Sequence, residues 1–303
     1  MSSKISLLSP VMKRAFILLH LAVFLAGFTG VFGRLIEINA GLITWYRLFF
    51  SAIFLFLIFL VSGRLQRESS SNILRIGFAG VLLGLHWVFF YASIKFSNIS
   101  IGVVCFSLGS FFTALIEPLM NKRKHSIPEL VLSGLTLCGI ALIFGLDATY
   151  RFGIMLGVIS SLIVTFYTIW NKRLTKTFNS TTITTYTMIG GWLGISLIMP
   201  FYLYLEPAVT LIPSLRDTGY LLILALVCTV LMYLMITEAL QKISAFTVNL
   251  SFNLEPLYSI VLAIIIYREN TELSWPFYVG LTMIVFSVLL QMYRVLRLKL
   301  VSN

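Results

Sequence analysis

An acidic side chain, Glu255, lies in a long apolar stretch of this sequence, directly before Pro256. Inside a membrane a charged side chain costs about 2.5–3.5 kcal/mol, so it needs a partner, a cavity or neutralisation. The proline removes a backbone donor and favours a kink in a helix. A carboxyl group beside a kink can hold a substrate ammonium group or a transported proton. The alternative is a protonated side chain that hydrogen-bonds a neighbouring helix.

Polar aromatic side chains gather in a second apolar stretch, where His86 and Trp87 are followed by Tyr91. Residues four apart share one face of a helix, so Trp87 and Tyr91 align. Tyr233 occupies the position equivalent to His86 in an internal repeat of the chain. We expect these four side chains to line a cavity, and His20 in the first apolar stretch is a further candidate. The alternative for Trp87 and Tyr91 is the aromatic belt at the outer membrane surface.

Amide side chains accompany Glu255, because Asn249 and Asn253 precede it in the same stretch and share a helix face. They can bind substrate or join two helices, and hydrogen bonds between membrane helices average only about 0.6 kcal/mol. Tyr167 is another candidate lining residue, together with Trp170 and Asn171, which approach a membrane surface.

Two other charged side chains are expected at the membrane surfaces. Arg47 lies near the outer end of an apolar stretch, and its long side chain can extend to water, so we interpret it as an anchor. Glu117 lies about one helical turn from the basic cluster Lys122–Lys124, which favours an interfacial salt bridge.

The composition places these residues in a membrane protein. The chain is 59% hydrophobic and 11% charged, with a mean hydropathy of +0.98, whereas soluble domains contain about 25% charged residues. Apolar stretches long enough to cross a bilayer as helices recur at residues 14–33, 42–62, 73–94, 101–120, 127–146, 152–171, 182–204, 218–237, 244–267 and 274–293. The sequence therefore predicts an all-α polytopic membrane protein with ten transmembrane helices.

The net charge of +11 is distributed unevenly between the two ends of these helices. Most Lys and Arg residues fall on the side that holds both termini. The opposite side holds Arg34, Lys95, Arg151, Arg216 and Arg268. Basic loops stay in the cytoplasm, so both termini are predicted to be cytoplasmic, and we expect the bacterial inner membrane. The basic residues thus indicate orientation, and no nucleic acid partner is expected.

Residues 91–124 and 238–270 resemble one another. Matching pairs, with one residue of slippage, are Ala92 and Ala239, Lys95 and Lys242, Ser97 and Ser244, Phe106 and Phe252, Leu108 and Leu254, and Gly134 and Gly280. Such self-similarity indicates a duplicated unit. It divides the chain into residues 1–147 and 148–303, each with five spans. Because five is odd, the halves are inverted, which is typical of secondary transporters with a substrate path near the midplane.

The tract 238–269, with Ala-Leu-x-x-x-Ser-Ala, Leu-Glu-Pro-Leu and a terminal Arg-Glu, resembles the EamA repeat of the drug/metabolite transporter superfamily. The resemblance covers nearly the whole chain as two repeats. The first copy departs from it, with Ser110 in place of Pro256 and Arg123 in place of Glu269. The resemblance implies a ten-helix bundle that exports small metabolites, often amino acids or related compounds. Their path would be a central cavity lined mainly by the first, third and fourth helices of each half.

Other function classes lack their motifs. No Gly-x-x-x-x-Gly-Lys-Ser/Thr is present, which disfavours direct ATP drive. An intramembrane enzyme remains the alternative, but the three histidines are scattered, and Gly-x-Ser-x-Gly and His-Glu-x-x-His are absent. A channel or scaffold is a third class.

We expect no cofactor or metal, and we interpret Cys105, Cys138 and Cys228 as buried structural thiols. The expected partners are a small-molecule substrate, the lipid bilayer and a coupled proton. The Gly-x-x-x-Gly stretches at 80–84, 153–157 and 190–194 permit close helix approach. Packing within the chain is the default interpretation, and the oligomeric state, monomer or homodimer, stays open.

Overall fold

The structure, a computed structural model, describes residues 10–61, 67–144, 150–207, 210–268, 270 and 275–301. These residues form helices and turns and contain no strand. Eight helical segments among them are long and apolar enough to cross a membrane, and two shorter apolar helices, Ile127–Leu142 and Trp275–Gln291, occupy the fifth and tenth positions. The predicted ten-helix fold is confirmed.

The first half contains α1 (Pro10–Leu35), α2 (Ala40–Val61), α3 (Ser70–Lys95), a fourth span divided into α4 (Ile99–Phe106) and α5 (Leu108–Met120), and α6 (Ile127–Phe144). The second half begins with α7 (Arg151–Leu174) and α8 (Ser180–Leu205). Its third span is α9 (Leu215–Ala225), the π-helical turn η1 (Leu226–Leu231) and α10 (Met232–Leu240). Its fourth is α11 (Ala245–Ser251), the 3₁₀ turn η2 (Phe252–Leu254) and α12 (Glu255–Tyr267), and its fifth is α13 (Trp275–Val301).

Short polar side chains begin six of these helices. A side-chain oxygen before the helix accepts a hydrogen bond from a backbone N–H in the first turn, which satisfies a donor that has no partner inside the helix. The residues that do this are Asn39, Ser69, Asn98, Asn179, Ser214 and Ser244. Asn98 and Ser244 begin the fourth span of each half, so the two halves begin these spans in the same way.

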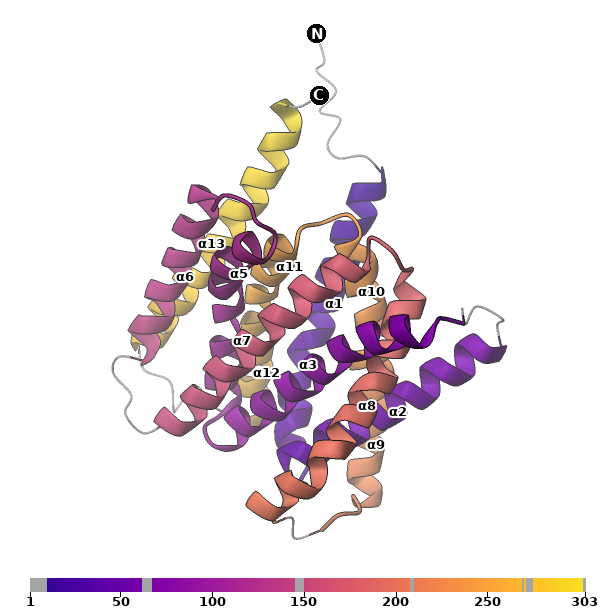
Figure 1. The fold of residues 1–303 in the computed structure, drawn as a ribbon. Helices are drawn as coiled ribbons and strands as arrows, with labels where there is room; N and C mark the ends of the chain where they lie inside the picture. Colours follow the sequence, from indigo (N-terminus) through magenta and orange to yellow (C-terminus); the bar gives the residue numbers. More distant parts are fainter. Residues whose placement is uncertain are drawn as a thin grey trace.

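Each main contact between helices of the two halves has an equivalent contact between the corresponding helices with the halves interchanged. α1 packs against α10 and α12, and its counterpart α7 packs against α3 and α5. α4 packs against α12 as α11 packs against α5, and the fifth helices α6 and α13 pack against one another (Figure 1). The first residues of α1 and the last residues of α13 lie at the same end of the bundle. This is the pseudo-two-fold arrangement of two inverted five-helix repeats.

Glycines let α3 of one half cross closely over α8 of the other. A Cβ atom on Gly80 would lie 2.0 Å from the Thr187 carbonyl oxygen, and one on Gly190 would lie 2.2 Å from the Gly77 Cα. On α7, a Cβ on Gly157 would lie 2.5 Å from a side chain of α4. The Gly-x-x-x-Gly stretches therefore serve packing between the halves of one chain.

The fourth span of each half is interrupted at an equivalent level. One residue, Ser107, separates α4 from α5, and three residues of 3₁₀ helix separate α11 from α12. The rings of Phe106 and Phe252, which lie beside the two interruptions, contact one another edge to face with centroids 5.9 Å apart. The breaks therefore meet between the halves, where the cavity described below is found.

Candidate functional site

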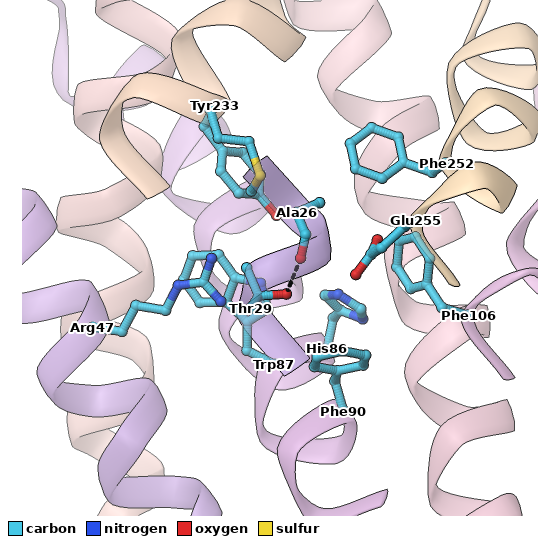
Figure 2. A pocket seen from close by; sticks show the side chains of 11 residues that line it. Ala26, Thr29, Arg47, His86, Trp87, Phe90, Phe106, Tyr233, Phe252 and Glu255 are labelled. Atoms are coloured by element: carbon cyan, nitrogen blue, oxygen red, sulfur yellow. Dashed lines mark hydrogen bonds between the residues drawn. The ribbon is translucent and has the colours of Figure 1, made fainter. Parts of the chain in front are cut away.

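A small cavity of about 30 Å³ lies between the two halves. It is lined by Ala26, Thr29, Arg47, His86, Trp87, Phe90, Phe106, Met232, Tyr233, Phe252 and Glu255 (Figure 2). Both halves contribute, through α1 to α4 of the first and through α10, η2 and α12 of the second. Aromatic rings form much of the lining, which also contains one carboxyl group, that of Glu255, and one guanidinium group, that of Arg47.

Glu255 is the first residue of α12 and follows the 3₁₀ turn directly. Its side chain is 3% exposed and extends toward Thr29 and His86. The Thr29 hydroxyl donates to the Ala26 carbonyl at 2.7 Å, and Thr29 lines the same cavity. The N-terminal end of a helix favours negative charge. The break before Pro256 thus places the carboxyl group at a helix N-terminus that faces the cavity.

Arg47 corrects the sequence interpretation, because it is an interior residue and no surface anchor. Its side chain is 1% exposed. It donates from Nε to Thr229 Oγ1 at 2.6 Å, from Nη1 to the Tyr91 hydroxyl at 2.8 Å and from Nη2 to the Cys228 carbonyl at 2.8 Å. The guanidinium carbon lies 3.7 Å from the centroid of the Trp87 ring. These partners hold the side chain inward, away from either membrane surface.

The π-helical turn η1 supplies two of the three acceptors. The backbone N–H of Met232 bonds to the Thr229 carbonyl rather than to that of Cys228, so the Cys228 carbonyl accepts from Arg47 instead. Thr229 also donates its hydroxyl proton to the Leu224 carbonyl at 2.7 Å. Widened turns of this kind are frequent at functional sites.

A sequence signal for the inward orientation of Arg47 was present but was missed. Thr44, Arg47 and Ser51 recur at helical spacing on α2, and all three are buried. Ser51 donates to the Ala225 carbonyl at 3.3 Å, which places this stripe against α9. A polar stripe on an otherwise apolar helix marks the face that packs inside the protein.

His86 joins the cavity to α7. Its Nδ1 lies 2.7 Å from Ser160 Oγ and 3.1 Å from the Ser160 carbonyl oxygen. The Ser160 hydroxyl donates or accepts in this contact according to the tautomer of the ring. The ring lies near the rings of Phe90 and Phe106, at 5.9 and 5.4 Å between centroids. His86 thus places a polar ring among the aromatic side chains of the cavity wall.

Trp87, Tyr91 and Tyr233 form one aromatic cluster around Arg47. The rings of Trp87 and Tyr233 meet edge to face with centroids 5.5 Å apart. Trp87 is 3% exposed and Tyr91 is fully buried, so the alternative that placed them in the outer aromatic belt is wrong. His86 and Tyr233, equivalent positions of the inverted repeat, line the same cavity. Tyr91 contacts the cavity lining through Arg47.

The remaining candidates lie outside the lining. Tyr167 lies behind Tyr233, outside the lining, with 6.1 Å between the centroids of the two rings. Its hydroxyl accepts a hydrogen bond from the Asn171 amide at 3.0 Å. Asn249 donates to Thr113 Oγ1 at 2.7 Å, and Asn253 donates to Ser110 Oγ at 3.1 Å. The two amides thus tie the fourth span of the second half to α5. On α1, the His20 ring nitrogen Nδ1 bonds to the Phe16 carbonyl of its own helix at 2.8 Å.

Two other expectations change. Glu117 lies near Phe246, Lys172 and Arg123. The ion pairs within 4.0 Å among the described residues are Arg14–Glu238 and Arg294–Glu129, so the expected contact of Glu117 with the basic cluster is not a close ion pair. Cys138 is exposed on α6, whereas Cys105 and Cys228 are buried as expected. Within the described ranges no three His, Cys, Asp or Glu side chains are grouped as a metal site would require.

The match to a family model decides the identity of this bundle, because the EamA-like transporter family model matches residues 13–145 and again residues 151–293. The chain belongs to the EamA-like transporter family. Each half thus carries one copy of the EamA unit, and the cavity lies where the two copies meet. A protein of Bacillus subtilis (strain 168), described as an uncharacterized transporter YxxF, is 22% identical over 269 residues, which are 85% of this chain and 83% of that protein.

A solved structure, titled only "Crystal structure of protein", superposes with a TM-score of 0.68 at 14% identity. The superposition covers 91% of this chain and 96% of that one. At this identity the likeness supports the EamA fold alone. Together, the family match and the apolar helices identify the protein as an integral membrane transporter.

Proposed function

We propose that this protein is a secondary transporter that exports small metabolites, such as amino acids or related compounds, by alternating access of its two halves. The observation that carries the proposal is the position of the cavity. Its walls come from both halves, and the interrupted fourth spans lie beside it. Broken helices at a repeat interface supply binding groups in many transporters, and rocking of one repeat against the other exposes the site alternately to the two sides.

In this proposal Glu255 is the coupling group. Glu255 is the first residue of α12, in the second half, and its carboxyl group faces the first half across the cavity. Taking up or releasing a proton there changes the charge of the cavity by one, so the two protonation states bind a solute with different affinity. His86 and Tyr233 supply polar contacts, and Trp87, Phe90 and Phe106 contact the apolar part of the solute. We place both termini in the cytoplasm and the protein in a bacterial inner membrane, on the distribution of basic residues.

The experiment is a metabolite screen followed by flux measurements. Cells with and without the protein are compared for the solutes that they retain and release, and each solute that differs is then tested with purified protein in sealed vesicles. Net movement of an unmodified solute supports the transporter. A chemically altered product without net flux contradicts it and favours the intramembrane enzyme. Flux through vesicles that shows neither saturation nor stimulation by solute on the opposite side contradicts alternating access and favours a channel.

A further inference from the structure

A positively charged group stands in the cavity wall without an adjacent negative partner. The acceptors of the Arg47 guanidinium among the described residues are two hydroxyl groups and one carbonyl, all of them uncharged. They replace the water that the guanidinium loses but leave its charge in place. A buried charge inside a membrane protein is costly, and such charges commonly mark the path of a substrate or an ion.

The guanidinium is held in a fixed orientation. It has five N–H donors, and three of them are engaged with partners on α3 and η1. One flat side stacks on the Trp87 ring, 3.7 Å from its centroid. Among the described residues the other two N–H donors have no partner, and Arg47 lines the cavity. A planar, fixed fork of N–H groups matches the two oxygens of a carboxylate.

Glu255, the acid of the cavity, forms no ion pair with the Arg47 guanidinium. Figure 2 shows Arg47 on one side and Glu255 on the other, with Thr29 and His86 between them. The ion pairs within 4.0 Å among the described residues do not include these two side chains. Opposite charges are therefore separated by the space that a solute would fill, and that space is bounded by the rings of Phe90, Phe106 and Phe252.

From this geometry we propose that Arg47 is the specificity-determining residue of the cavity and that it binds a carboxylate group of the transported solute. The inference rests on the proposed function, because it treats the cavity as the transport site. The carboxylate lies at the edge of the guanidinium, and the apolar body of the solute lies against the aromatic rings. Its other end then faces Glu255, where a proton or an ammonium group is accommodated.

The test compares carboxylates with their amides as ligands of the detergent-purified protein. The probes are 3-phenylpropionate and 3-phenylpropanamide, which share the same apolar body, and stabilisation of the folded protein against heat reports their binding. We expect the carboxylate to bind about 10-fold to 150-fold more tightly than the amide, the range for a hydrogen bond to a charged group. Equal binding of the two, or binding of neither, overturns the inference without any variant.

The variants test whether Arg47 causes the preference. Arg47→Gln is expected to remove it, and Arg47→Lys to keep part of it, because lysine retains the charge but lacks the fork. The matched control is Arg34→Gln, since Arg34 also stacks on an aromatic ring, 4.4 Å from the centroid of Tyr267, but lies outside the cavity lining. A folded Arg47→Gln protein that keeps the preference for the carboxylate contradicts the assignment.

The same proteins in sealed vesicles separate the two proposals. A protein that binds carboxylates selectively but moves no solute in counterflow overturns the proposed function and leaves the ligand assignment standing. A protein that moves solutes while showing no preference for carboxylates overturns the role of Arg47 and leaves the transporter standing.

Discussion

Replacing Thr229 with valine tests whether the π-helical turn holds Arg47 in the cavity wall. The hydroxyl of Thr229 accepts from Arg47 Nε at 2.6 Å and donates to the Leu224 carbonyl at 2.7 Å. A hydrogen bond to a charged group contributes about 1.5–3 kcal/mol to stability. Because the other two hydrogen bonds of Arg47 and its stacking on Trp87 remain, we expect Thr229→Val to lower the free energy of unfolding by about 2 kcal/mol.

The assay is unfolding of the purified protein in mixed detergent micelles, followed by tryptophan fluorescence. A double-mutant cycle with Arg47→Met isolates the contribution of this one contact, since the coupling energy of residues in contact is about 0.5–3 kcal/mol, whereas distant residues add within about 0.5 kcal/mol. We expect a coupling energy of at least about 1 kcal/mol. Thr282→Val is the matched control, because Thr282 is exposed on α13 and bonds only to the Tyr278 carbonyl of its own helix among the described residues. Additive effects of Thr229→Val and Arg47→Met would refute the account of the turn.

Two further predictions concern packing between the halves. Gly80→Ala is expected to destabilise the protein by about 1–3 kcal/mol, because the new Cβ would lie 2.0 Å from a backbone oxygen of α8. Gly219→Ala is the control in the same unfolding assay, because no atom lies within 4 Å of the new Cβ. It is expected to be neutral or stabilising by up to about 1 kcal/mol. If Gly80→Ala and Gly219→Ala changed the free energy of unfolding in the same direction, the close crossing of α3 and α8 would be contradicted. Asn249→Val is expected to cost about 0.6 kcal/mol in unfolding, through its bond to Thr113 on α5. If Asn249→Val left stability unchanged but abolished solute flux, Asn249 would be a substrate-binding residue instead.

The ten-helix fold was predictable because each span needs about 20 apolar residues, and that requirement is visible in one sequence. The pairing of His86 with Tyr233 was also predictable, since inverted repeats place equivalent residues on facing walls. The cavity position of Glu255 followed from the cost of an acid in a membrane. These expectations depend on length, hydropathy and symmetry, which do not require knowledge of side-chain packing.

The stripe of Thr44, Arg47 and Ser51 indicates that Arg47 faces inward, but its partners required the structure. Its neighbours Trp45 and Tyr46 are typical of a membrane surface, so the sequence favoured an anchor. The deciding partners are the carbonyl of Cys228 and the hydroxyl of Thr229, which a π-helical turn presents. No motif in the sequence marks that turn. Likewise, the interruption at Ser107 has no proline to announce it.

The roles of the two asparagines could not be decided from spacing. Asn249 and Asn253 lie on one face of a span that passes both the cavity and α5. Their shared face therefore fits substrate binding as well as a contact with another helix. The structure directs both amide groups to hydroxyl groups of α5. Which neighbour a polar side chain meets depends on the rotation of the helix, and a single sequence does not specify that rotation.

Proton-coupled solute flux in sealed vesicles, measured for Glu255→Gln beside the native protein, tests whether Glu255 couples transport to protons. Glutamine keeps the size of the side chain and removes its titration. We predict that flux of a transported solute through the native protein responds to an imposed pH difference, and that the folded variant loses this response and at least about 90% of its flux, a factor of ten that corresponds to about 1.4 kcal/mol. Glu238→Gln is the control, because Glu238 pairs with Arg14 at 2.9 Å outside the cavity. Native flux and an unchanged response to pH in Glu255→Gln would contradict the account.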